Sequence, residues 1–446
     1  MKKFLLLVTL ALSSVGFSQV WTEQTPGYPV SGSYTGDVSI VDASIVWSMV
    51  QRTTATNHQT YARTINGGTS WTTGTINVGN TTGLGIGNIS AVSATTAWVS
   101  AFPTTAGLAT QGVYKTTDGG ATWIRQAGAA FTANSFINFV HFFNATEGVC
   151  MGDKLGNYFE IYTTTDGGTS WTRTPQLNIA ATTTNYGYTG KFYVKGNTIW
   201  FGTDGGELMK SINKGLNWTK ITTPVLDFGG GTVTNEASEF AFRDDNNGII
   251  VKENFNTATT PPTYLSKNVY RTTNGGGVWT EYTPGTGMYH GSVDYAGTSM
   301  MVSAGSSTGD FGSSYSLDNG TTWTNIDGLS HTFLKYASAT IGYGGGFATG
   351  GVGGIFKFTN NLGISSFSEN DLVIYPNPVQ DVVKISTNNA SINAITLSDV
   401  NGRTIKTSNF NNFNEVELSV SELNSGIYFL NINTEKGFVV KKLIKE

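Results

Sequence analysis

One octapeptide pattern recurs seven times along this chain and constrains its fold more than any other feature. The pattern is Ser/Thr-x-Asp/Asn-x-Gly-x-Thr/Ser-Trp, and its copies begin at residues 64, 116, 164, 211, 272, 316 and 359. The last copy, TNNLGISS, fits the pattern least well. Successive copies begin 43 to 61 residues apart. A repeat unit of that length is typical of arrays in which each unit forms one small sheet. We therefore predict an all-β chain of seven similar units.

The third position of each copy is aspartate or asparagine. Its side-chain oxygen can accept hydrogen bonds from backbone N–H groups of its own turn. The glycine permits a positive φ angle, and the tryptophan can cover the hairpin with a large apolar face. We expect these residues to brace a hairpin and to take no part in catalysis. The seven positions are Asn66, Asp118, Asp166, Asn213, Asn274, Asp318 and Asn361.

Four strand-like segments surround each copy of the motif. Around the second copy they are 89–92, 97–100, 112–115 and 123–125. Four short strands in a unit of this length make one blade of a β-propeller. The blades are predicted at 36–80, 88–130, 135–178, 189–225, 236–285, 289–326 and 331–366.

The last blade lacks a fourth strand of its own, and the start of the chain can supply it. Residues 20–27 (VWTEQTPG) nearly repeat residues 278–285 (VWTEYTPG), which open a fourth strand. We therefore predict that the N-terminal strand closes a seven-bladed propeller over residues 19–366. Closure removes the open sheet edges that would favour association, so we expect a monomer.

Composition and targeting features exclude several classes of protein. The formal net charge is −4 and only 13% of residues are charged, which argues against a nucleic-acid partner. Residues 1–18, with Lys2, Lys3 and a short apolar run, are predicted to be a secretory signal peptide, and no apolar stretch has the ~18 residues of a membrane span. The single cysteine, Cys150, lies in a strand-like run and is expected to be a buried apolar residue, with a reactive thiol as the alternative.

Composition changes after Ser366. Residues 367–371 are predicted to be a linker, and residues 372–446 alternate apolar and polar residues in short strands, as in a small β-sandwich. Three motifs stand out there: YPNP at 375–378, DVNGR at 399–403 and LNSGIY at 423–428. Their order and spacing resemble the C-terminal sorting domain of the type IX (Por) secretion system. The resemblance implies a Bacteroidetes-like bacterium, secretion machinery that binds residues 372–446, removal of this domain, and a secreted or cell-surface product.

The octapeptide also resembles a known repeat. Copies two, three and six match all key positions of the Asp-box, or bacterial neuraminidase repeat, which braces the hairpin between the third and fourth strands of a blade. The repeat region as a whole is similar to sialidase-like propellers and to those of photosystem II assembly factors. The assembly factors bind a membrane protein through a basic patch. This chain has no such patch, so the resemblance implies the fold and not the partner.

The long connections between strands fall on the face opposite the motif turns, which is where we expect ligand binding. They carry aromatic side chains beside carboxylates and an amide (Asn185), a combination that suits contact with a glycan or a peptide. The alternative is that these aromatics pack loops and the acids are solvated. The predicted ligand-binding residues are Tyr186, Tyr188, Phe228, Phe255, Tyr264 and Phe311.

Catalysis is the alternative function. A sialidase needs three arginines for the substrate carboxylate, whereas Arg63, Arg173 and Arg271 lie in or beside the motif hairpins. A glycoside hydrolase acting on an extracellular polysaccharide needs two carboxylates, for which Asp227, Glu253 and Asp310 are the candidates.

Metal binding has weaker support. His141, His290 and His331 fall in or near first strands, without the short ligand spacing of a metal site. We predict no metal and no cofactor, and we interpret the chain as a secreted or surface-displayed binding module for a glycan or protein ligand.

Overall fold

The structure is a computed structural model, and its contacts divide the chain into two compact units, Val20–Thr359 and the C-terminal residues after Thr359. The predicted signal peptide and linker and the motif residue Asn361 lie outside the described residues, as does Asn185. The described residues are 20–28, 32–52, 55–104, 110–132, 135–184, 186–229, 235–260, 262–306, 310–349, 352–359, 372–387, 391–400, 403–434 and 437–446.

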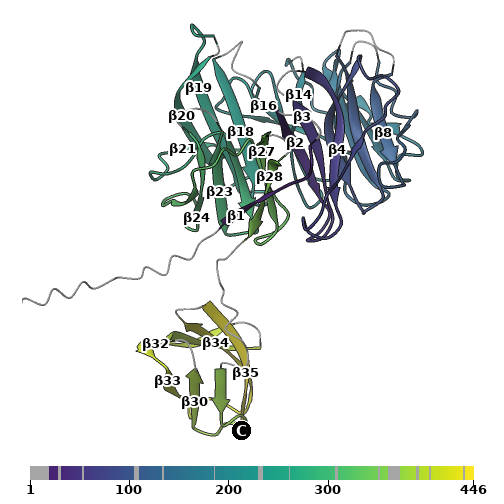
Figure 1. The fold of residues 1–446 in the computed structure, drawn as a ribbon. Coiled ribbons are helices and arrows are strands. Elements are labelled where there is room, and N and C mark those ends of the chain that lie inside the picture. Colours follow the sequence, from purple (N-terminus) through teal and green to yellow (C-terminus); the bar gives the residue numbers. More distant parts are fainter. Residues whose placement is uncertain are drawn as a thin grey trace, which may run out of the picture. The chain divides into compact units, whose positions relative to one another are not determined.

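The larger unit is all-β apart from a single 3-10 turn, η1 (Gln176–Asn178), among the described residues. Five four-stranded antiparallel sheets follow one another along the chain, each with its strands in sequence order (Figure 1). They are β6 (Leu84–Ala91), β7 (Ala97–Pro103), β8 (Gly112–Thr116) and β9 (Ile124–Arg125); β10 (Ile137–Phe142), β11 (Gly148–Leu155), β12 (Tyr158–Thr164) and β13 (Thr172–Arg173); β14 (Gly187–Lys195), β15 (Thr198–Thr203), β16 (Glu207–Ser211) and β17 (Thr219–Thr222); β18 (Glu236–Phe242), β19 (Gly248–Asn256), β20 (Thr263–Thr272) and β21 (Thr280–Tyr282); and β22 (Ser292–Ala296), β23 (Met300–Gly305), β24 (Gly312–Ser316) and β25 (Thr324–Asp327).

The remaining strands of this unit form one eight-stranded sheet with two halves. One half is β2 (Ser33–Ile40), β3 (Val46–Arg52), β4 (Ala55–Thr64) and β5 (Thr72–Thr75). The other is β26 (Leu334–Tyr336), β27 (Gly342–Thr349), β28 (Val352–Thr359) and the N-terminal β1 (Val20–Gln24). β1 pairs antiparallel with β28, with Val20 opposite Thr359 and Gln24 opposite Ile355. A single pair, Tyr34 with Phe347, joins the two halves.

The first residues of the second strands in the larger unit are buried on both faces. In β15 and β19 the sequence there is accordingly a continuous apolar run, Ile199-Trp200-Phe201 and Ile249-Ile250-Val251. Cys150 lies in such a run in β11 and is fully buried, which confirms its expected role as an apolar residue. Burial raises the pKa of its thiol.

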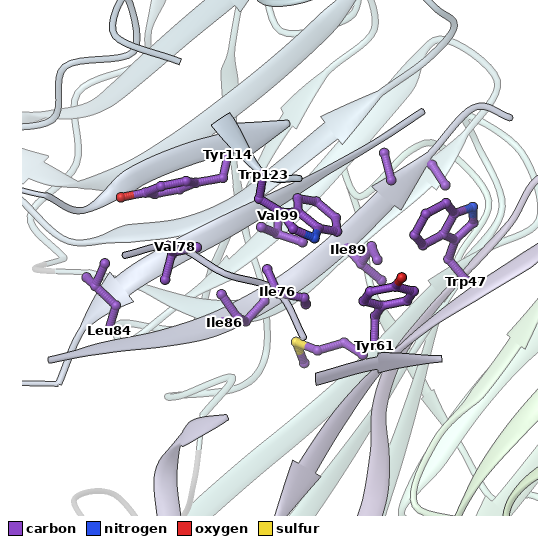
Figure 2. Packing of buried hydrophobic residues seen from close by; sticks show 14 residues of the cluster. Trp47, Tyr61, Ile76, Val78, Leu84, Ile86, Ile89, Val99, Tyr114 and Trp123 are labelled. Atoms are coloured by element: carbon purple, nitrogen blue, oxygen red, sulfur yellow. The ribbon is translucent and has the colours of Figure 1, made fainter. Parts of the chain in front are cut away.

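The apolar cores lie between neighbouring sheets. Figure 2 shows one of them, in which Trp47 and Tyr61 of β3 and β4 meet Ile89 and Val99 of β6 and β7. Trp123, from the second motif, lies in the same cluster, with its ring centroid 6.4 Å from that of Trp47. The motif tryptophan therefore fills the boundary with the preceding sheet, which is a larger role than the predicted cover over its own hairpin.

Trp21 of β1 supplies a tryptophan to the sheet whose own motif has lost one. It is 4% exposed, and its ring centroid lies 5.0 Å from those of Phe358 and His331. Its Nε1 donates a hydrogen bond to Ser313 Oγ of β24 at 2.9 Å. Trp21 thus occupies the boundary with the preceding sheet, as Trp123 does in the second repeat.

The motif turns are held by the side chain at the third position. In the six described copies its Oδ1 accepts a hydrogen bond from the backbone N–H four residues later, at 2.8–3.0 Å. In Asp118 the second oxygen also accepts from the Thr122 hydroxyl at 2.6 Å. The hydrogen bonds from Thr122, and then one from the Thr116 hydroxyl, lower the pKa of Asp118 to about 2.

The C-terminal unit consists of two antiparallel sheets that contribute to one apolar core, with Ile385 and Leu418 from one sheet and Leu397 and Leu430 from the other. The YPNP motif is tied to the last strand, because Asn377 Oδ1 accepts from Ile444 N at 2.9 Å. One sheet is β29 (Leu372–Tyr375), β30 (Val382–Thr387) and β33 (Glu415–Ser419), and the other is β32 (Thr404–Phe413), β31 (Ile392–Asp399), β34 (Gly426–Thr434) and β35 (Gly437–Lys445).

Candidate functional site

The predicted site residues separate into two groups, and the first group surrounds His290. Glu253 Oε1 lies 2.5 Å from Nδ1 of His290, and Asp310 Oδ2 lies 3.2 Å from Nε2. Tyr264 stacks on the imidazole, with ring centroids 3.8 Å apart and planes 4° from parallel. Phe255 makes an edge contact with Tyr264, with centroids 6.5 Å apart.

The side chains of this first group are largely buried, and burial shifts the pKa values of several of them. Burial raises the pKa of Asp310 and raises that of Tyr264 to about 12. Burial also lowers the pKa of the nearby Lys267, whose ammonium donates a hydrogen bond to the Met288 carbonyl oxygen. His290 thus contacts both carboxylates of this group, with one near each ring nitrogen.

The second group surrounds Asp227. Its Oδ1 accepts hydrogen bonds from the Tyr188 hydroxyl at 2.5 Å and from Gly229 N at 2.8 Å. Tyr186 makes an edge contact with Tyr188, with ring centroids 5.4 Å apart. Phe228 is fully buried and packs on Phe240, so its ring lies in the core and not on the surface where the prediction placed it.

Several of these residues lie on strands and not in loops. Phe255 and Tyr264 were predicted to lie in a long connection between strands, but β19 continues to Asn256 and β20 starts at Thr263. Glu253 therefore pairs with Lys267, and Phe255 with Tyr264, across the sheet. The apolar alternation of this hairpin is weak, which is why the sequence did not reveal the longer strands. Phe311 precedes β24 and is 48% exposed, as a ligand contact requires.

The three histidines do not meet. His331 Nε2 lies 3.0 Å from Asp327 Oδ2, His290 is held as described above, and His141 packs edge-on against Phe143 at 4.7 Å. Across the described ranges, no three His, Cys, Asp or Glu side chains are grouped so that they could hold a metal ion.

A cavity lies among the first strands of the sheets of the larger unit. We call it the inner cavity; its volume is about 480 Å³. Strands β2, β6, β10, β14, β18, β22 and β26 all contribute to its wall. Charged, hydroxyl and aromatic side chains share the lining, including Lys191, Glu239, Thr189, Phe192 and His141.

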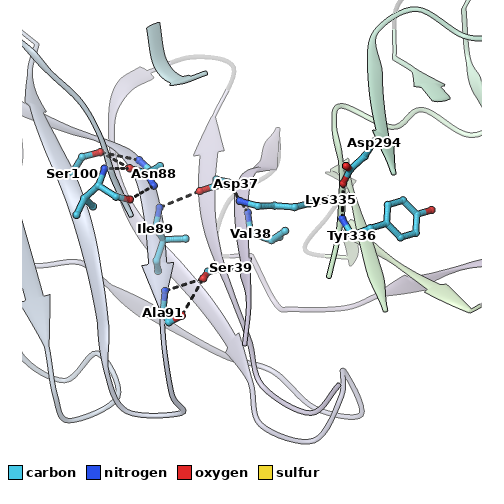
Figure 3. A network of polar contacts seen from close by, with 11 residues as sticks. Asp37, Val38, Ser39, Asn88, Ile89, Ala91, Ser100, Asp294, Lys335 and Tyr336 are labelled. Carbon is cyan, nitrogen blue, oxygen red and sulfur yellow. Dashed lines mark hydrogen bonds and ion pairs between the residues drawn. The ribbon is translucent and has the colours of Figure 1, made fainter. Parts of the chain in front are cut away.

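Polar side chains join several of the first strands to one another around this cavity, and Figure 3 shows those that involve β2, β6, β22 and β26. Asp37 Oδ2 accepts from Ile89 N at 3.2 Å, and Asp294 Oδ2 accepts from Tyr336 N at 2.7 Å. Lys335 of β26 extends to Asp37 of β2 and forms an ion pair of 3.0 Å. This pair links the last of these strands to the first.

Strand β14 closes part of the inner cavity by bulging into it. Gly187 pairs with Thr203 and Phe192 with Phe201, so five residue steps on β14 match two on β15. The extra residues reach β6, where a Cβ on Gly87 would lie 2.6 Å from Thr189 Cγ2. Gly190, at the tip, has a φ of +71°, a conformation that glycine adopts without steric conflict.

A second hollow of about 430 Å³ adjoins the inner cavity and shares Ser39, Ser90 and His141 with it. It extends to the exposed Ala145, in the turn after β10. The motif turn of the same sheet is adjacent, because Gly167 N donates to Thr146 O at 2.9 Å. The hollow thus lies on the side of the motif turns, opposite the face where we predicted ligand binding.

The C-terminal residues 373–446 match the family described as the secretion system C-terminal sorting domain. This domain indicates secretion to the cell surface or the extracellular space. No helix in the described segments is long and apolar enough to span a membrane. No curated protein sequence matches the chain.

Several solved structures are similar to this chain. A structure titled YCF48 bound to D1 peptide is 14% identical, with 77% of this chain and 96% of that chain covered and a TM-score of 0.51. YCF48 from Cyanidioschyzon merolae is 17% identical, with 76% and 98% covered and a TM-score of 0.50. A GH74 xyloglucanase from Xanthomonas campestris is 11% identical, with 82% and 59% covered and a TM-score of 0.46. The YCF48 likenesses concern the fold alone, and the repeated sheets fit a propeller.

Proposed function

We propose that residues 20–359 form a closed seven-bladed propeller that binds an extracellular glycan or protein, and that the type IX machinery exports it through a C-terminal β-sandwich. Equivalent contacts at two sheet boundaries support the closed ring. Lys115 of β8 donates to Gly167 O of the next motif at 2.8 Å. Lys357 of β28 donates to Gly67 O, the matching oxygen of the first motif, at 2.7 Å.

The observation that favours binding over hydrolysis is the engagement of the candidate carboxylates. A glycoside hydrolase needs two carboxyl groups that flank the scissile bond and that the substrate can reach. Glu253 and Asp310 instead hold the two nitrogens of His290, and Asp227 accepts from Tyr188 in the other group. In contrast, Tyr186 and Phe311 are 38% and 48% exposed and can contact a ligand directly.

The test uses the purified secreted protein on arrays of immobilised glycans and extracellular proteins. We expect retention on at least one of them, a marked loss with Tyr186→Ala or Phe311→Ala, and no release of new reducing ends. Leu177→Ala is the matched control, because Leu177 is fully exposed and was not predicted to bind.

The hydrolase interpretation makes the opposite prediction. Release of reducing ends that Glu253→Gln or Asp310→Asn abolishes, while retention persists, would replace the binding module with a glycoside hydrolase. Absence of retention on every glycan and protein would also contradict the proposal.

A further inference from the structure

We propose that the inner cavity binds a neutral sugar ring, either as a free saccharide or as the end of a glycan chain. This inference rests on the proposed function, because it gives the binding module a second site with a ligand class of its own. The proposed ligand contacts residues of the first strands, which were not among those predicted to bind a ligand on the face opposite the motif turns.

The charge of the lining favours a neutral ligand. Its six charged side chains balance, with Lys191, Lys195 and Lys335 facing Asp37, Glu239 and Asp294. Two of the lysines are already in ion pairs, Lys335 with Asp37 and Lys191 with Glu239. A ligand with net charge would leave an uncompensated charge in this partly enclosed site, which is unfavourable.

The hydrogen-bonding groups of the lining suit hydroxyl groups, each of which both donates and accepts. An ion-paired lysine keeps N–H groups to donate, and its carboxylate partner keeps lone pairs to accept. Burial lowers the pKa of His141 to about 3, so its ring is neutral and offers one donor and one acceptor. Thr189, on the bulge of β14, adds a hydroxyl.

An aromatic side chain in the lining and the volume of the inner cavity also suit a sugar ring. Phe192 lines the cavity and rests on Phe139, with ring centroids 4.6 Å apart. Its half-buried ring can pack against the C–H face of a sugar. The volume of about 480 Å³ is in the range of small-molecule sites, which are roughly 300–1,000 Å³.

The second hollow provides a route of access. It shares His141 with the inner cavity and reaches Ala145 on the side of the motif turns. On β14 the bulge at Thr189 and Gly190 approaches β6 closely at Gly87. A glycan chain could therefore place its terminal ring inside, with the rest of the chain leaving past Ala145.

The experiment titrates the purified secreted protein with sugars that differ in charge, using ligand-detected NMR and calorimetry. Glucose, galactose, mannose and N-acetylglucosamine are the neutral ligands, and glucuronate and glucosamine are the charged counterparts of glucose. His141→Phe keeps the ring packing and removes both nitrogens, and Thr189→Val removes one hydroxyl at nearly constant volume. Leu177→Ala, at a fully exposed position outside the cavity, is the control variant.

We expect at least one neutral sugar to bind and its charged counterpart to bind more weakly. His141→Phe and Thr189→Val should each weaken binding by about 3- to 10-fold, the effect of a lost neutral hydrogen bond, and Leu177→Ala should leave it unchanged. If the His141→Phe variant does not fold, the effect of Thr189→Val on sugar binding tests the inference. An array of glycans ending in the bound sugar then separates a chain-end ligand from a free saccharide.

The inference is wrong if no neutral sugar binds, if a charged counterpart binds more tightly, or if the cavity variants bind as the wild type does. If these titrations fail while array retention remains sensitive to Tyr186→Ala, only the inner-cavity site is lost. If array retention fails as well, the proposed function is lost with it.

Discussion

The indole Nε1 of Trp21 donates a hydrogen bond to Ser313 Oγ at 2.9 Å across 292 residues of sequence. The bond joins the first strand of the described chain to β24, in the sheet that precedes the one containing β1. Trp21 therefore stabilises a boundary between two sheets, and it does so at the point where the two ends of the repeat region meet.

Trp21→Ala should lower the free energy of unfolding of the larger unit by about 3–5 kcal/mol, because it removes a large buried side chain and leaves a cavity. Chemical denaturation followed by tryptophan fluorescence measures the change. Leu177→Ala, at a fully exposed position, is the control and should have no effect. An unchanged unfolding midpoint for Trp21→Ala would show that β1 contributes little to the fold.

Removal of residues 372–446 should stop export while leaving the larger unit folded. The apolar core of the C-terminal unit is its own, so the deletion opens no cavity in the sheets of Val20–Thr359. Immunoblots of periplasm, cell surface and medium measure the location, with the full chain as control. Wild-type amounts of the truncated protein in the medium would contradict a sorting role.

The hairpins of the second, third and sixth motifs should loosen in acid. The pKa of Asp118 is lowered from 3.8 to about 2, so its stabilising hydrogen bonds are complete above pH 3.8 and are lost as the pH falls through 2. Hydrogen exchange of the Thr122 amide should accelerate across that range.

Asp118→Asn is the matched variant, because asparagine naturally occupies the third position of the motif in three other copies, as Asn66, Asn213 and Asn274. The amide does not titrate, so exchange at Thr122 should lose this acid-induced change. Identical acid sensitivity in the two proteins would mean that another group governs the hairpin.

Asp294 should give the stability a pH dependence of the opposite sign. Burial raises the pKa of its carboxyl from 3.8 to about 6, so the folded protein favours the protonated form. The resulting stabilisation is complete below pH 3.8 and is lost as the pH rises through 6.

The difference in stability between the Asp294→Asn variant and the wild type, measured as a function of pH, tests this dependence. Between pH 4 and pH 7 the stability of the variant should rise relative to wild type by about 2–3 kcal/mol, since one pKa unit corresponds to about 1.4 kcal/mol. Any lost hydrogen bond from Tyr193 or Tyr336 adds a constant offset that does not vary with pH. Parallel pH profiles would contradict the raised pKa.

Glu253→Gln should destabilise the fold by about 1–2 kcal/mol, because a charged hydrogen-bond acceptor on His290 becomes neutral. Thermal unfolding measures the loss. Glu281→Gln, an exposed carboxylate on β21, is the control. A destabilisation of this size would agree with a structural use of Glu253, whereas an unchanged stability would make the carboxylate available for other roles.

The sequence by itself determined the repeated hairpins and their chemistry. The octapeptide is local, so the hydrogen bond from Thr122 to Asp118 depends on residues only four positions apart. Such contacts follow from side-chain type and spacing without knowledge of the rest of the fold. The sorting domain could also be predicted from the sequence, because each of its motifs is a contiguous segment. Residues 373–446 match the corresponding family.

Only the tertiary structure decided which distant side chains meet. The sequence suggested Glu253 and Asp310 as free acids, and folding placed both on His290. It suggested Phe228 as a surface aromatic, and packing against Phe240 buried the ring. Strand alternation gives the face of a residue only when the strand limits are known, and the weakly patterned hairpin around Phe255 concealed them.

The inner cavity depended still more on the tertiary structure. Its wall takes residues from seven first strands, and no local pattern records that Lys335 lies beside Asp37, 298 residues away. The bulge of β14 is visible in the sequence only as Gly187 and Gly190, which could mark an ordinary turn. Local hydrogen bonding and apolar periodicity thus determined the repeated sheets, whereas the packing of those sheets around one another determined which polar groups enclose a cavity.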